Sequence, residues 1–226
     1  MKKAVLFGAS GFIGAHLLSS LLNSKDYEVV TVVVRRKLDV HHPKLKVLIG
    51  DYHSLPTLKE DIVADEVFIA LGTTKNKTPE RQAYYEVDHD YPVLAAKIAK
   101  ERGARAVFMV TAVGANPKAA VFYLRTKGEA ERDLLALNFE HTHIFRPSML
   151  MGNRKESRPL ERFFMAIWWF IGPLLIGKGL EKYRGISGKQ VAKAMVNAAQ
   201  NQTEQLKIYH WREMQDLLES STTNLL

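Results

Sequence analysis

The 226-residue sequence contains no cysteine, only three tryptophans and no uncharged run long enough to span a membrane. The lack of cysteine excludes a disulfide scaffold, a thiolate metal site and a cysteine nucleophile. Hydrophobic residues make up 46% of the chain and charged residues 25%, which excludes a disordered chain of low hydrophobicity. The composition therefore predicts a globular protein, and the length favours a single domain with a self-sufficient core.

The N-terminus shows no secretory signal pattern, because Met1-Lys2-Lys3 leads into a short apolar run that Gly8 interrupts. We therefore expect a cytoplasmic protein. Lysine and arginine exceed aspartate and glutamate by 32 to 24, a net charge of +8, but basic and acidic residues are interleaved. This pattern favours a small anionic ligand and no nucleic acid. The histidine pairs His41-His42 and His141/His143 have no third ligand at a motif spacing, so no metal site is predicted.

Short apolar runs alternate with longer amphipathic segments over the first 145 residues. The run from Val29 to Val34 is rich in β-branched residues and unbroken, which is typical of a strand buried on both faces of a parallel sheet. Strands are predicted over Ala4 to Phe7, Val29 to Val34, Leu45 to Ile49, Glu66 to Leu71, Ala106 to Val110 and His141 to Phe145. Helices are predicted after Gly14, from Glu80 to Arg102 with a kink at Pro92, and from Ala119 to Leu137. This order predicts an α/β fold with a doubly wound parallel sheet.

A glycine-rich turn separates the first predicted strand from the first predicted helix. Gly8 can take the tight turn, Gly11 admits a phosphate, and Gly14 lets the helix and the strand pack closely. The N–H groups at the start of the helix would then face a pyrophosphate. The turn predicts a dinucleotide site of the Rossmann type, formed by Gly8, Ser10, Gly11, Phe12, Ile13 and Gly14.

The second predicted strand ends at Arg35 and Arg36, where an NAD-selective site would present a carboxylate to the ribose. Guanidinium groups suit a 2′-phosphate, and an aspartate there would repel it. NADP(H) is therefore the predicted cofactor, although a solvated arginine pair at a strand end is the alternative. Asp51, after the third predicted strand, could accept a hydrogen bond from the adenine amino group or could cap the next turn.

Tyr123 and Lys127 are four residues apart in a predicted helix, which places the phenol and the ammonium on one helical face. A nearby cation stabilises a phenolate and lowers its pKa toward neutral pH. Tyr123 could then pass a proton to a carbonyl oxygen as hydride arrives, while Lys127 reaches the nicotinamide ribose. Such a pair is common on solvated helices, but its place after a fifth Rossmann strand favours catalysis.

After Arg146-Pro147 the regular alternation stops, and we expect residues 148–226 to add a small substrate or cap lobe to one NAD(P)-binding Rossmann domain that covers residues 1–226. The uncharged segment from Phe163 to Gly177 could roof the substrate site or touch a membrane surface, and either role favours an apolar or amphipathic ligand. Arg154, Lys155 and Arg158 could orient an acidic substrate or lie in a solvated loop. A helix is predicted from Ser187 or Gly188, a strand from Leu206 to Tyr209 and a helix from Trp211 to Leu218.

Several stretches carry a wider likeness: Gly8 to Gly14, Ala70 to Thr74, Val87 to Tyr91, Tyr123 to Glu129, Phe145 to Pro147 and Glu156 to Pro159. They resemble the short-chain dehydrogenase/reductase superfamily and, more narrowly, the Tat-interacting-protein-like branch of its atypical members. The resemblance implies NADP(H) bound by the glycine turn and Arg35, and catalysis by Tyr123 and Lys127. It also implies ribose contacts from Leu71, Gly72 and Thr73, and nicotinamide contacts from Pro147 to Met149.

One position departs from the superfamily pattern. A serine usually follows the fifth strand and polarises the substrate carbonyl, whereas Thr111 is the hydroxyl at hand here, twelve residues before Tyr123. We expect Thr111 to assist the substrate oxygen, and catalysis would suffer if its hydroxyl is turned away.

Three functions follow from these patterns. The first is an NADPH-dependent oxidoreductase that acts on a small carbonyl or alcohol, and an apolar substrate is compatible with the sequence. The second is an NADPH-bound regulatory module that contacts a protein or membrane through residues 154–183. The third is a sugar-nucleotide epimerase or dehydratase, for which the C-terminal region is short. Both a monomer and a homodimer are compatible with the sequence.

Overall fold

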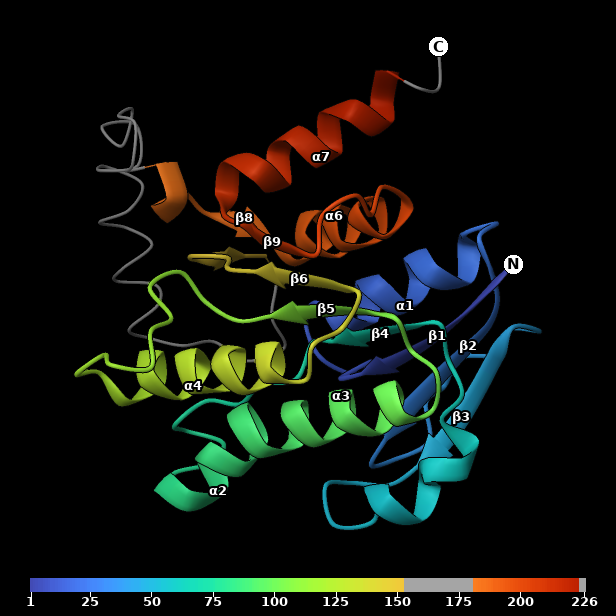
Figure 1. Cartoon of the computed structure of the whole chain (residues 1–226), viewed down its shortest axis with the longest axis horizontal. Coiled ribbons are helices and arrows are strands. Elements are labelled where there is room, and N and C mark those ends of the chain that lie inside the picture. Colours follow the sequence, from blue (N-terminus) through green and yellow to red (C-terminus); the bar gives the residue numbers. More distant parts are fainter. Residues whose placement is uncertain (153–180, 224–226) are drawn as a thin grey trace.

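The computed structural model describes residues 1–152 and 181–223 of the chain. Its main sheet has seven parallel strands in the order β3-β2-β1-β4-β5-β6-β9, with helices on both faces (Figure 1). The chain runs outward from β1 to β3, returns to the middle, and then continues to the other edge. This reversal confirms the predicted doubly wound Rossmann-type sheet.

The strands follow the apolar runs of the sequence. They are β1 (Lys2–Phe7), β2 (Tyr27–Val34), β3 (Leu45–Ile49), β4 (Glu66–Ile69), β5 (Ala106–Val110), β6 (His141–Phe145) and β9 (Leu206–Tyr209). The inner strands β4 and β5 are buried along their whole length, because helices cover both faces. β2 begins before the predicted Val29, and β4 ends before the predicted Leu71.

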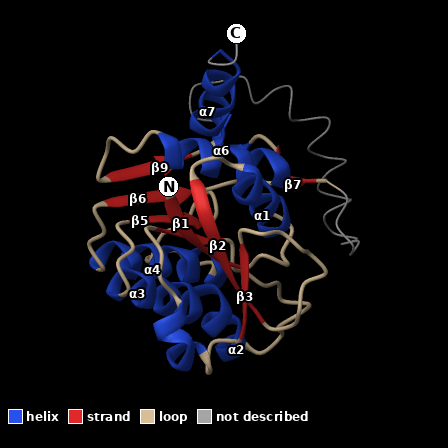
Figure 2. Cartoon of the chain, turned by 90° about the vertical axis from the view of Figure 1, so that its right-hand side faces the viewer, coloured by secondary structure: helices blue, strands red, loops and turns tan. Residues whose placement is uncertain are grey.

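Two helical layers enclose the sheet (Figure 2). The helices are α1 (Gly14–Asn23), α2 (Arg81–Tyr85), α3 (Tyr91–Glu101), α4 (Phe122–Ala136), α6 (Gly188–Gln200) and α7 (Trp211–Thr223), with short 3-10 turns at η1 (Leu55–Asp61) and η4 (Glu181–Tyr183). One apolar core lies between the sheet and α1, α6 and α7, and the other lies between the sheet and α3 and α4. α4 begins at Phe122 rather than at the predicted Ala119, and α7 continues past the predicted end at Leu218.

The helix predicted from Glu80 to Arg102 is interrupted before Pro92 rather than at it. α2 passes into a π turn, η2 (Glu86–Asp90), and α3 then begins at Tyr91. Pro92 lies in the first turn of α3, directly after the π turn, and its ring has no N–H to donate to the preceding turn. The π turn buries the side chains of Asp88 and His89 beneath α4.

The C-terminal residues join the main domain. β9 pairs with β6, and α6 packs beside α1 (Figure 1). Two short strands, β7 (Leu150–Met151) and β8 (Ile186–Ser187), form a second parallel sheet, and Ser187 caps α6 through a capping box with Gln190.

The predicted substrate lobe is described only in part. The segment from Phe163 to Gly177, and Arg154, Lys155 and Arg158, lie outside the described residues. Within residues 1–152 and 181–223, no helix is both long and apolar enough to cross a membrane.

Candidate functional site

The loops that follow β1, β4, β5 and β6 meet at the carboxyl edge of the sheet. The Ala70 N–H donates to the carbonyl of Phe7 at 2.9 Å, which ties the loop after β4 to the end of β1. The Val113 N–H donates to the carbonyl of Pro147 at 3.0 Å, which ties the loop after β5 to the loop after β6. Ligands of open α/β sheets bind at this edge, where the strand order reverses.

The glycine turn allows backbone to pack directly on backbone. Gly8 has a φ of +90°, and a Cβ built on it would lie 2.5 Å from the carbonyl oxygen of Ala70. A Cβ on Gly14 would lie 1.9 Å from the carbonyl oxygen of Gly8, so no other residue fits there. No side chain caps α1, and its first turn holds no acidic residue. This cradle fits the pyrophosphate of a dinucleotide, which the helix N-terminus would hold through its N–H groups.

The other predicted cofactor residues lie around this cradle. Arg35, Arg36, Ser10 and Gly72 are exposed; Phe12, Leu71, Thr73 and Met149 are partly exposed; Ile13 and Pro147 are buried. Phe12 lies against Gly152 and Gly188, where an added Cβ would come within 3.0 Å of its ring. The glycine turn therefore contacts the start of α6 as well as the sheet.

The charges of Arg35, after β2, and of Asp51, after β3, both act on Tyr91. Sequence reasoning missed this residue. Burial raises the pKa of Tyr91 to about 12, the charge of Asp51 adds to this effect, and the charge of Arg35 opposes it. Asp51 caps the following turn, because its Oδ1 accepts from the N–H of Ser54 at 3.0 Å and from its hydroxyl at 2.8 Å. The capping alternative is therefore observed, and these hydrogen bonds lower the pKa of Asp51.

Tyr123 and Lys127 lie on one face of α4, as the spacing predicts, with Tyr123 40% exposed and Lys127 5% exposed. The Lys127 ammonium forms an ion pair with the Oδ1 of Asp88, which is 1% exposed. The other carboxylate oxygen of Asp88 accepts from the N–H of Thr73 at 2.9 Å. A Cβ on Gly72 would lie 3.6 Å from the Lys127 ammonium, so Lys127 adjoins the predicted ribose loop.

Electrostatics keep Lys127 charged. Burial alone would lower its pKa, but the charges of Asp88, Tyr123 and Glu131 and the hydrogen bond to Asp88 outweigh burial, and the net effect raises the pKa. The sequence offered no specific signal for Asp88, because a regular helix would not identify which acidic residue points inward.

Thr111 has a different partner from the predicted one. Its hydroxyl donates to the Oε1 of Glu131 at 2.5 Å, and both residues are buried. Glu131 also pairs with Arg146, whose Nε donates to the same oxygen at 3.0 Å. In this arrangement the hydroxyl hydrogen of Thr111 is directed to α4, so donation to a substrate would require that the bond to Glu131 breaks. Sequence reasoning missed this buried pair because nothing in the spacing links Glu131 to Arg146.

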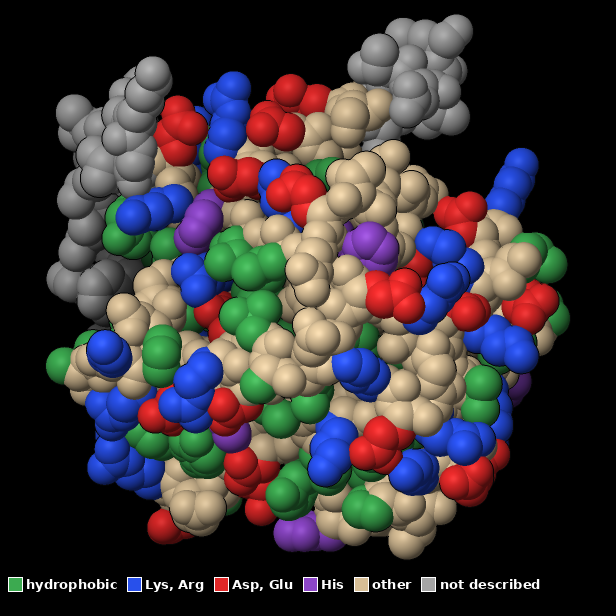
Figure 3. Space-filling model, viewed as in Figure 1, with side chains coloured by type: hydrophobic (Ala, Val, Ile, Leu, Met, Phe, Trp, Pro, Cys, Tyr) green, Lys and Arg blue, Asp and Glu red, His purple; other side chains and the backbone are tan. Residues whose placement is uncertain are grey.

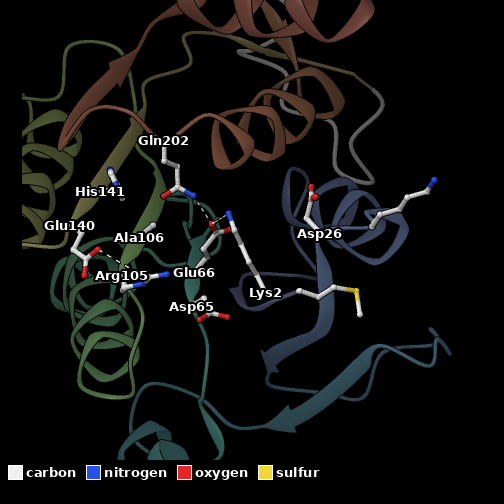
Figure 4. Close-up of a pocket in the computed structure, with 11 residues that line it drawn as sticks. Lys2, Asp26, Asp65, Glu66, Arg105, Ala106, Glu140, His141 and Gln202 are labelled. Carbon is white, nitrogen blue, oxygen red and sulfur yellow. Dashed lines mark hydrogen bonds and ion pairs between the residues drawn. The ribbon is translucent and has the colours of Figure 1, made fainter. Parts of the chain in front are cut away.

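A pocket of about 670 Å³ lies at the opposite, amino edge of the sheet, where β1, β4, β5 and β6 begin (Figure 4). Its buried acid, Glu66, accepts from Lys2 at 2.6 Å, from Tyr27 at 2.5 Å and from Gln202 at 2.5 Å. These side chains form hydrogen bonds with one another. The glycine turn and Lys127 lie at the carboxyl edge, away from this pocket. The visible face of the molecule carries basic and acidic side chains side by side (Figure 3), as the interleaved sequence predicts.

Comparison with known proteins agrees with this geometry. A sequence family described as "NAD(P)H-binding" matches residues 8–202. "Protein FMP52, mitochondrial" from Candida glabrata is 34% identical over 203 residues, covering 89% of this chain and 86% of the relative. The protein of the same name from Eremothecium gossypii is 30% identical and covers 97% of this chain and 99% of the relative.

The fold also matches solved structures. MoeE5 in complex with UDP-glucose and NAD superposes with a TM-score of 0.67 at 19% identity, covering 97% of this chain and 82% of that protein. The Bordetella bronchiseptica enzyme WbmH in complex with NAD⁺ gives a TM-score of 0.69 at 19% identity, with 93% and 76% covered.

One prediction is corrected by these relatives. The fungal proteins that match most of the chain are named mitochondrial, so the predicted cytoplasmic location was wrong. The matched residues include the glycine turn, Tyr123 and Lys127, and the fold is the one that the short-chain dehydrogenase/reductase resemblance implies. The chain therefore belongs to the NAD(P)H-binding family.

Proposed function

We propose that the protein is an NADPH-dependent oxidoreductase that transfers hydride to or from a small carbonyl or alcohol. The observation that carries the proposal is the position of Tyr123 and Lys127 on one face of α4, with the Lys127 ammonium beside Gly72 at the carboxyl edge of the sheet. The glycine turn lies at the same edge. A proton donor and a dinucleotide cradle at the same edge of the sheet support this function.

The bound dinucleotide would supply or accept the hydride. Tyr123 is partly exposed, so its hydroxyl can reach a substrate oxygen and give it a proton, or take one in the reverse direction. Lys127 lies deeper and stays charged, and its field stabilises the phenolate form of Tyr123. The ammonium also faces the loop from Leu71 to Thr73, where it could bind the nicotinamide ribose. Pro147 to Met149 follow β6 at the same edge and would contact the nicotinamide.

The preference for NADPH over NADH is supported by the end of β2. Arg35 and Arg36 are exposed where an acid would bind the ribose hydroxyls of NADH. The charge of Arg35 lowers the pKa of Tyr91 and that of Asp51 raises it, so both charges act near the start of α3. A 2′-phosphate at the carboxyl end of β2 would meet the cations of Arg35 and Arg36, at the place where an NAD-selective site has an acid.

The test combines binding and turnover. Purified protein is titrated with NADPH by fluorescence, and a panel of aldehydes, ketones and quinones is then screened for oxidation of the nicotinamide. We expect turnover with at least one carbonyl class. Tyr123→Phe should then reduce turnover by about 10²-fold or more and leave NADPH binding nearly unchanged. The matched control Tyr183→Phe, which removes another partly exposed phenol, should keep both. Turnover that survives in Tyr123→Phe would contradict the proposal.

A further inference from the structure

The π turn η2 places two ionisable side chains in the interior, Asp88 at 1% exposure and His89 at 8%. A π turn widens a helix by one residue and is found often at functional sites. Here it carries an acid to the underside of α4, where Lys127 projects inward. An α-helix that continued from α2 into α3 would place the side chain of Asp88 differently.

Asp88 connects two elements that carry the proposed chemistry. One carboxylate oxygen pairs with the Lys127 ammonium on α4, and the other accepts from the N–H of Thr73 after β4 at 2.9 Å. Both charged groups are buried, so each would be costly to hold without the other. The pair fixes where the ammonium lies relative to Gly72 and Tyr123.

His89 holds the π turn in place. Its Nδ1 lies 2.8 Å from the Oδ1 of Asp90, and its Nε2 lies 2.9 Å from the Oδ2 of Asp133 on α4. Its ring stacks on Tyr85 with the centroids 4.5 Å apart. The turn is thus clamped to α4 at the residue next to Asp88, which limits how far the carboxylate can move away from Lys127.

We propose that Asp88 is the positioning residue of the Tyr123/Lys127 pair, holding the buried Lys127 ammonium in its charged form and at a fixed distance from the loop after β4. This inference rests on the proposed function for its catalytic meaning. Asp88 does not touch the reacting atoms; it acts through Lys127. Without its charge, the buried ammonium would keep only the effects of Tyr123 and Glu131 to offset its burial.

The test measures Lys127 directly and needs no substrate. The acetylation rate of each lysine is followed against pH by competitive labelling with acetic anhydride and peptide mass spectrometry. In the wild-type protein the midpoint for Lys127 should lie above that of the exposed lysines. Asp88→Asn should lower the Lys127 midpoint by about 1 to 3 pH units, because the buried cation loses its counter-charge. Glu86→Gln, an isosteric change in the same π turn at a residue that faces the exposed His53, should leave that midpoint in place.

Two results would overturn the proposal. One is a Lys127 midpoint that stays the same in Asp88→Asn or moves equally in Glu86→Gln. The other, which applies even if Asp88→Asn does not fold, is a wild-type midpoint at or below that of the exposed lysines. A protein that binds no NADPH would refute the proposed function, but it would leave the labelling result intact, so the two failures can be told apart.

Discussion

The acid sensitivity of the fold should depend strongly on the buried His143. His143 on β6 is 1% exposed, its ring stacks on Phe108 at 4.7 Å, and its Nδ1 lies 2.9 Å from the hydroxyl of Tyr209. Its Nε2 has no hydrogen-bond partner within the described residues. Burial, with a smaller contribution from the charge of His141, lowers the pKa of His143 to about 4. The folded protein therefore holds this imidazole neutral.

The size of the effect follows from the two pKa values. The ordinary histidine pKa is 6.5, and the pKa of His143 in the folded protein is about 4. This difference of about 2.5 corresponds to about 3 kcal/mol of unfolding free energy. The pKa of His143 is lower in the folded protein than in the unfolded chain. Its contribution to stability is therefore complete at a pH above the unfolded-state pKa and is lost as the pH falls toward the folded-state pKa. At about pH 5 the protein should have lost about 2 kcal/mol of its unfolding free energy relative to about pH 8.

The assay is urea unfolding at about pH 8 and about pH 5, followed by circular dichroism. The wild type should lose about 2 kcal/mol more than His143→Phe across this range, because the variant cannot take up the proton and keeps the stack on Phe108. His41→Phe, which removes an exposed histidine, should behave like the wild type. Equal losses in the wild type and in His143→Phe would refute the reasoning.

Two further predictions concern the carboxyl edge. Gly14→Ala should abolish NADPH binding, measured by fluorescence titration, because the added Cβ would clash with the backbone of Gly8. The control is Gly103→Ala, at a glycine that has a positive φ but has open space around it. It should cost only about 1 kcal/mol of stability and keep NADPH binding. Retained binding in Gly14→Ala would contradict the packing argument. Thr111→Val should lower the unfolding free energy by about 1 kcal/mol and slow carbonyl reduction less than tenfold, because the Thr111 hydroxyl donates its hydrogen bond to Glu131. A loss of about 10²-fold or more in reduction would instead assign Thr111 to the substrate oxygen.

Much of the fold could be predicted from local pattern. The unbroken run from Val29 to Val34 indicated a strand buried on both faces, and the glycine turn indicated where a strand passes into a helix. The structure gives the physical reason for the turn, because Gly14 lies against the backbone of Gly8. These signals are local, so a single sequence carries them.

The missed features depend on contacts between distant residues. The π turn at Glu86–Asp90 packs against α4, and a helical pattern alone does not mark the extra residue. The pairing of Lys127 with Asp88 depends on that turn, and the bond from Thr111 to Glu131 depends on the position of α4 relative to β5. Spacing placed Tyr123 and Lys127 on one face, but it could not name their partners.

The central claim is that this edge of the sheet binds NADPH in preference to NADH. The most direct measurement is a fluorescence titration of the wild type and Arg35→Asp with both dinucleotides at the same ionic strength. We expect the wild type to bind NADPH at least about tenfold more tightly than NADH, and Arg35→Asp to lose this preference through a weaker affinity for NADPH. Equal affinities in the wild type, or an unchanged preference in Arg35→Asp, would contradict it.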